Sequence, residues 1–115
     1  MRHYMKLNPS PFDMIKSGRK TIELRLNDEK RQCISTGDEI EFSNTENNNL
    51  KLLTQVIAIH RFNSFEELYQ NLPLLKCGYT EDDISSAKSS DMDFYYSKKQ
   101  QNKYGVLGIE LKVIE

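Results

Sequence analysis

The sequence has little cysteine and no long hydrophobic run, and each absence excludes a class of protein. Cys33 and Cys77 are the two cysteines of the 115-residue chain, and they do not form a Cys-x-x-Cys pair. Together with His3 and His60 they offer no recognisable zinc-ligand spacing, so we expect free, reduced thiols and no bound metal. No apolar run reaches membrane length and no signal peptide is recognisable, which predicts a cytoplasmic protein without membrane association.

The sequence also lacks a glycine-rich phosphate loop and any strong excess of one charge. The missing loop predicts that the protein holds no cofactor. Sixteen Lys and Arg against 17 Asp and Glu give a net charge of −1, which argues against a general nucleic-acid binder. Residues 1–36 nevertheless carry eight basic and four acidic side chains, whereas residues 37–115 carry eight and thirteen. We therefore expect a locally basic site that suits a short or single-nucleotide ligand better than a long duplex.

Length and hydrophobic pattern predict one α+β domain that spans residues 1–115. Alternating apolar residues predict strands at 3–7, 20–26, 38–42, 52–62 and 107–113. Capping patterns predict helices that start at Ser10, Ser64 and Thr80, and a further helical stretch covers 91–101. The segment 52–62 is apolar on both faces, which predicts a central strand covered on both sides. A sheet that buries such a strand tends to curl, so we expect a small mixed β-barrel with surrounding helices.

The stretch from Gly18 to Arg25 carries the most information about function. If residues 21–26 form a strand, Ile22 and Leu24 face a core and the charged Glu23 and Arg25 share the opposite face. Their Cα atoms would then lie about 7 Å apart, with Lys20 at the mouth of the strand. Charged residues that alternate with apolar ones are also typical of an ordinary solvated strand.

The pattern Gly-x-Lys-x-x-Glu-x-Arg resembles the signature of the ASCH domain (activating signal cointegrator homology), a branch of the PUA-like superfamily. Gly18, Lys20, Glu23 and Arg25 match its four fixed positions. The resemblance extends to residues 8–15, the turn at 36–38 and the closing segment 104–109, and so covers most of the chain. It implies a PUA-like β-barrel and a cleft beside the motif that binds RNA or modified nucleosides.

The motif residues suit recognition of a nucleotide. Lys20 and Arg25 could hold phosphate or base oxygens, and the arginine would do so with a planar fork of donors. Glu23 could accept a hydrogen bond from an exocyclic amine or act as an acid or base. The alternative interpretation is a structural ion pair of Glu23 with Arg25 or Lys20 that seals one end of the barrel.

Other side chains are candidates for the rim of this cleft. Lys6 would line it if the first strand neighbours the second, and Arg19 would broaden the basic rim. Tyr96 and Tyr104 could stack unpaired bases, with core or rim packing as the alternative role. We expect Phe94 to lie in the core.

An enzymatic role is the second hypothesis. The resemblance includes a branch that hydrolyses N4-acetylcytidine with the motif lysine as base and a threonine as nucleophile. This chain keeps Lys20 but has Glu23 at the threonine's position, and only Asp91 and Asp93 are conceivable proton donors. Some ASCH proteins are ribonucleases, for which Lys20 and Glu23 would be the catalytic pair.

Three hypotheses therefore stand. The first is an RNA- or nucleotide-binding module, expected as a monomer, that uses a cleft of lysine, glutamate and arginine. The second is an amidohydrolase or ribonuclease that works at the same cleft. The third is a structural or protein-interaction domain whose charged motif only closes the barrel.

Overall fold

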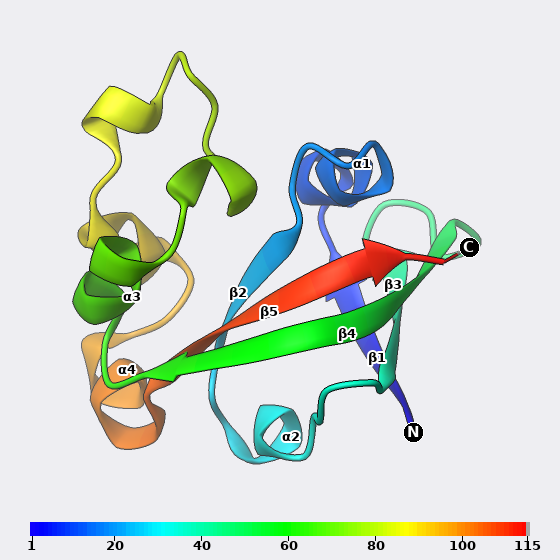
Figure 1. Cartoon of the computed structure of the whole chain (residues 1–115), viewed down its shortest axis with the longest axis horizontal. Coiled ribbons are helices and arrows are strands. Elements are labelled where there is room, and N and C mark those ends of the chain that lie inside the picture. Colours follow the sequence, from blue (N-terminus) through cyan, green and yellow to red (C-terminus); the bar gives the residue numbers. More distant parts are fainter. Residues whose placement is uncertain (115) are drawn as a thin grey trace.

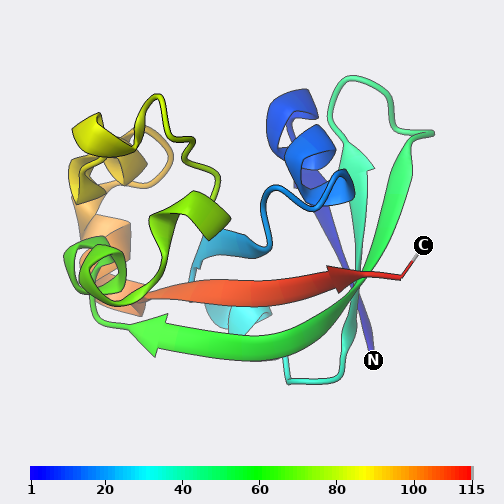
Figure 2. The ribbon, with the colours of Figure 1, turned by 45° about the horizontal axis from the view of Figure 1, so that its top comes forward.

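Five strands form one mixed sheet in the order β1-β3-β4-β5-β2. Residues 1–114 are described by the computed structural model. The strands are β1 (Arg2–Leu7), β2 (Ile22–Leu26), β3 (Glu39–Asn44), β4 (Lys51–Phe62) and β5 (Val106–Val113). β1 and β3 run parallel and the other neighbouring pairs run antiparallel. The sheet curls into a half-barrel (Figures 1 and 2), which confirms the predicted α+β fold.

The helices lie in separate groups around the sheet (Figure 1). α1 (Pro9–Lys16) follows β1, and the short α2 (Glu29–Gln32) lies in the connection from β2 to β3. Residues 65–104 form what we call the helical lobe, which stands apart from α1 in both ribbon views (Figures 1 and 2). The lobe contains α3 (Phe65–Asn71), α4 (Lys98–Tyr104) and three 3₁₀ turns, η1 (Leu74–Lys76), η2 (Ile84–Ser86) and η3 (Ser89–Phe94). No helix in this part of the chain is both long and apolar enough to cross a membrane.

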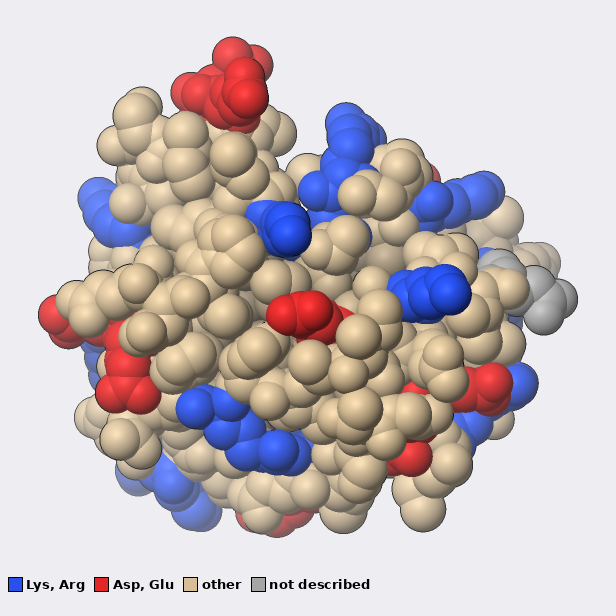
Figure 3. Space-filling model, viewed as in Figure 1, with Lys and Arg blue, Asp and Glu red and all other residues tan. Residues whose placement is uncertain are grey.

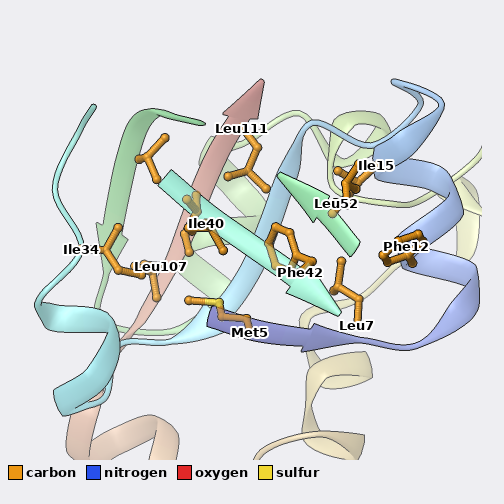
Figure 4. Packing of buried hydrophobic residues seen from close by; sticks show 12 residues of the cluster. Met5, Leu7, Phe12, Ile15, Ile34, Ile40, Phe42, Leu52, Leu107 and Leu111 are labelled. Carbon is orange, nitrogen blue, oxygen red and sulfur yellow. The ribbon is translucent and has the colours of Figure 1, made fainter. Parts of the chain in front are cut away.

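Two buried clusters hold these parts together. The larger one packs Phe12 and Ile15 of α1 against the curled sheet, where Phe42 of β3 is fully buried (Figure 4). The second cluster joins β2 to the helical lobe, through Ile22 and Leu24 among others. The alternation predicted for residues 21–26 is thus confirmed on its apolar side, and β2 is fixed between the barrel and the lobe.

β4 is the central strand, as predicted, but it is not covered on both faces. Ile57 is 50% exposed, at a register irregularity between Val56 and Ala58. A bulge of this kind adds an unpaired residue and redirects its side chain. The apolar run 56–59 therefore indicated the strand correctly. The prediction that both faces of the strand are covered is wrong.

Three of the helix predictions need correction. A turn followed by the three-residue η2 replaces the helix expected from Thr80. The stretch 91–101 is broken into η3 and α4, because the Ser97 hydroxyl accepts a hydrogen bond from the Gln100 amide at 3.1 Å and starts a new helix. α1 begins at Pro9, after Asn8, rather than behind a Ser10 cap.

The prediction that Phe94 lies in the core is wrong, because this side chain is 88% exposed. Met92 is buried and Tyr96 packs against the lobe cluster. In the tight turns of η3, Phe94 falls out of phase with these two neighbours and points away from the core.

Candidate functional site

A cavity of about 560 Å³ opens between α1 and the helical lobe. Its lining comes from the end of β1, from α1, from residues 20–25 and from residues 69–96 of the lobe. The space-filling view shows a notch at this place, between acidic side chains over the tip of the lobe and basic ones over α1 (Figure 3). The Gly-x-Lys-x-x-Glu-x-Arg spacing thus places Lys20, Glu23 and Arg25 in one concave site.

Glu23 lies between two cations in this cavity. Its Oε1 is 2.7 Å from the Lys20 Nζ and its Oε2 is 2.7 Å from the Arg25 Nε. The three side chains are only 6% (Glu23), 11% (Lys20) and 14% (Arg25) exposed. Burial acts to raise the pKa of Glu23, but the charges of Lys20 and Arg25 outweigh it and the pKa is lowered. The site therefore holds a fixed, ionised carboxylate whose two oxygens are both paired.

Arg25 also joins the two edges of the half-barrel. Its Nη2 donates a hydrogen bond of 2.8 Å to the Lys6 carbonyl on β1, the edge strand opposite β2. On the same edge, the Lys30 ammonium donates to the Tyr4 carbonyl at 2.7 Å. These side chains satisfy carbonyl groups that a closed barrel would pair with backbone amides. Arg25 therefore supports the fold as well as facing the cavity.

The lobe side of the cavity carries a chain of hydroxyl groups that ends on a carboxylate. The Tyr79 hydroxyl donates to Asp91 Oδ2 at 2.8 Å and lies 2.7 Å from the Tyr69 hydroxyl. The hydrogen bond from Tyr79 lowers the pKa of Asp91, with a smaller contribution from the Lys88 amide. Burial raises the pKa of Tyr79, so its hydroxyl stays neutral and remains a donor. This wall therefore presents ionised Asp91 as an acceptor.

The stem of Lys20 lies beside the backbone of Gly78 in the lobe. Gly78 has φ of +114°, and a Cβ atom at this position would lie 3.4 Å from the Lys20 Cδ. The neighbouring Cys77 is buried and also lines the cavity. Close approach of the backbone at Gly78 thus shapes the channel in which the lysine stem lies.

Cys77 is expected to resist thiol reagents at neutral pH. Burial raises its pKa to about 11, whereas Cys33 is exposed. Since the thiolate is the reactive form, alkylation at pH 8 should modify Cys33 well before Cys77. Mass spectrometry of peptides after timed iodoacetamide treatment measures both rates, and equal rates would contradict the burial described here. The same burial argues against Cys77 as a nucleophile.

The predicted site residues divide into two groups. The cavity lining includes Lys6, Lys20, Glu23, Arg25 and Tyr96. Arg19 and Tyr104 lie outside the lining: the Arg19 Nε donates to the Ser17 hydroxyl, and the Tyr104 hydroxyl donates to Glu29 on α2.

Tyr96 contributes less free surface than expected. Its ring is stacked on Phe65, with centroids 6.2 Å apart and planes inclined by 15°. The face that packs on Phe65 is not free to hold a base. The most exposed aromatic side chains of the cavity lining are the nearby Phe94 and Tyr95, at 88% and 62% exposure.

Sequence reasoning missed most of the lobe wall. Tyr69, Cys77, Gly78 and Tyr79 line the cavity without forming a local motif with the residues around them. Asp91 was a candidate only through the resemblance to an enzyme branch. Within residues 1–114, no group of three or more His, Cys, Asp or Glu side chains is arranged to hold a metal ion.

Comparison with known proteins supports the interpretation of the motif. A family model of the ASCH domain matches residues 5–115. A search of curated proteins finds no match. Among solved structures, the crystal structure of hypothetical protein PH0355 is 30% identical, with a TM-score of 0.81 over 99% of this chain and 100% of that one. The solution structure of PF0455 from Pyrococcus furiosus is 31% identical, with a TM-score of 0.76 over 100% and 99%.

A more distant neighbour shows the fold alone. The crystal structure of ASCH from Zymomonas mobilis is 15% identical to this chain, with a TM-score of 0.67. The match covers 96% of this chain and 66% of that protein. The curled sheet and its flanking helices are therefore shared well beyond the range of close sequence similarity.

Proposed function

Because the chain belongs to the ASCH domain family, we propose that it binds single-stranded RNA or a nucleotide in the cavity between α1 and the helical lobe. ASCH domains are generally RNA-binding, which supports this ligand class. The observation that carries the proposal is the buried group of Lys20, Glu23 and Arg25 at the cavity. A fixed pair of cations in a concave, partly aromatic site suits an anionic ligand with a planar base.

The cations keep donors available for a ligand. An ammonium group has three N–H donors and a guanidinium has five. Lys20 directs one donor at Glu23, and Arg25 uses one for Glu23 and one for the Lys6 carbonyl. The remaining donors can contact phosphate or base oxygens without breaking the ion pairs. Lys6, exposed at the end of β1, adds a third cation to the lining.

We propose binding rather than hydrolysis. Glu23 stands where the N4-acetylcytidine branch has its threonine nucleophile, and both of its carboxylate oxygens are held in ion pairs at 2.7 Å. Asp91 has a lowered pKa, so it is ionised at neutral pH and has no proton to donate. The amidohydrolase interpretation therefore lacks both a nucleophile and a proton donor at this site.

A change at Lys6 tests the proposal without disturbing the buried ion pairs. We expect Lys6→Gln to weaken binding of a fluorescein-labelled single-stranded oligoadenylate by several-fold and to reduce the salt slope by about 0.7, the effect of one lost phosphate contact. Fluorescence anisotropy at several salt concentrations measures both quantities. Lys112→Gln, at an exposed position of β5 outside the cavity, is the matched control.

Two outcomes would count against this site. Equal losses for Lys6→Gln and Lys112→Gln would mean that the oligonucleotide binds through overall charge rather than in the cavity. If the wild-type protein showed no measurable binding, single-stranded nucleic acid would be excluded as the class of ligand.

A further inference from the structure

Two consecutive aromatic side chains, Phe94 and Tyr95, project into solvent at the mouth of the cavity. They are 88% and 62% exposed, and both belong to the cavity lining. Their ring centroids are 5.2 Å apart and their planes are inclined by 84°. Exposing two adjacent aromatic rings to water is unfavourable in free energy, and the hydrophobic residues around them are packed instead. The pair is therefore an unexplained feature of the site.

This exposure is not the result of a loosely held segment. Met92 on one side of the pair is buried, and Tyr96 on the other side is stacked on Phe65. The buried Gln101 side chain donates to the Tyr96 carbonyl and to Asp93 Oδ1, at 2.9 Å each. The segment is thus fixed immediately before and after the two rings, and their outward direction is a property of the fold.

Charge is divided between the two sides of the cavity. Residues 1–26, which include β1, α1 and β2, carry six Lys and Arg against two acidic residues. Residues 74–97 of the lobe carry two lysines against five acidic residues. The space-filling view shows this contrast across the notch (Figure 3). A phosphate group is attracted to the α1 side, which leaves the aromatic side for bases.

We infer that Phe94 and Tyr95 form a stacking platform for a base of a single-stranded nucleic acid whose phosphates lie on the α1 side. This inference rests on the proposed function and deepens it: the ligand is an oligonucleotide rather than a free nucleoside. One nucleotide occupies the cavity at Lys20 and Arg25, and the adjacent base stacks on the exposed rings. Base stacking on aromatic side chains tolerates any sequence, because every base has a π-face.

The test compares ligands that differ in their bases. The double variant Phe94→Ser/Tyr95→Ser should bind the labelled oligoadenylate at least about five-fold more weakly than wild type, the loss expected for one stacked base. Binding of adenosine monophosphate, followed by NMR titration, should weaken by a much smaller factor, because the proposal places a single nucleotide at Lys20 and Arg25 and only the adjacent base of an oligonucleotide on the rings. A ribose-phosphate strand without bases should bind both proteins equally.

Tyr4→Ser is the matched control, since Tyr4 is 58% exposed on β1 and does not line the cavity. Both platform residues are exposed, so the double variant is expected to fold, and its melting temperature checks this. An oligoadenylate affinity that the double variant retains, while Lys6→Gln lowers it, would overturn the platform and leave the proposed function standing. No binding of oligoadenylate to the wild-type protein would overturn both and assign the rings to another kind of partner.

Discussion

Replacing Glu23 by glutamine is expected to lower the free energy of unfolding by about 3 kcal/mol, because removing one partner of a buried ion pair leaves the others uncompensated. Glu23 is the only counter-charge within 4.0 Å recorded for Lys20 and for Arg25 in residues 1–114. For a domain of this size, that loss should lower the melting temperature by roughly 10 °C. Thermal and urea denaturation of the two proteins measure the difference.

Glu46→Gln provides the control, since Glu46 is exposed at the tip of the connection between β3 and β4. It removes the same charge without disturbing a buried pair. If both variants melted at the wild-type temperature, the ion pairs would not support the fold.

The contribution of Glu23 should also depend on pH in a defined direction. The pKa of Glu23 is lowered in the folded protein from its ordinary value of 4.5, chiefly because Lys20 and Arg25 outweigh the effect of burial. The unfolded chain therefore binds the proton first, and the contribution is present above about pH 4.5 and lost as the pH falls. The stability difference between wild type and Glu23→Gln should shrink on acidification. A difference that stayed constant down to acid pH would show that charge at Glu23 does not matter.

Replacing Lys20 by methionine is expected to cost the largest amount of ligand affinity. A hydrogen bond to a charged group contributes about 1.5–3 kcal/mol, which corresponds to roughly 10- to 150-fold weaker binding of the oligoadenylate. Methionine keeps an unbranched stem beside Gly78, and Arg25 still neutralises Glu23, so stability should change far less than in Glu23→Gln. Anisotropy titration and thermal melting of the same sample separate the two effects.

Lys16→Met is the control for net charge, because Lys16 is exposed on α1 and does not line the cavity. Similar affinity losses in both variants would place the ligand on the basic surface rather than in the cavity. Full affinity in Lys20→Met would remove this lysine from the proposed binding site.

The two interpretations of the charged motif turn out to be compatible in this structure. The ion pairs of the structural alternative are present, since Glu23 contacts both cations. The same three side chains line a cavity and keep unused donors. Glu23 therefore fixes the direction of the cations, and a ligand would meet them already in place, which reduces the entropy lost on binding.

The correctly predicted features are those that depend on local periodicity. Alternation located β2 and the buried Ile22 and Leu24, because a strand sends successive side chains to opposite faces. The Ser64 cap located the start of α3, where its hydroxyl accepts from the Glu67 amide. Local patterns fix an element and its faces wherever the neighbouring residues in the chain decide them.

Such local patterns could not predict features that depend on packing between distant segments. Phe94 is apolar and lies in a helical-looking stretch, yet the break at Ser97 and the tight turns of η3 direct it to solvent. Tyr104 likewise turns to Glu29, across 75 positions of the chain, instead of to the cavity. In both cases the direction of the side chain follows from how the lobe packs.

The sequence by itself determined the family, the α+β class and the charged strand that carries Glu23 and Arg25, with Lys20 just before it. Only the tertiary structure decided that Tyr79 and Asp91 line one cavity with these residues, and that Arg25 reaches the Lys6 carbonyl to join the sheet edges. The physical reason is the range of the interactions. A two-residue period can be recognised from adjacent residues of the sequence. A cavity forms between segments that only the packing of the whole chain brings together.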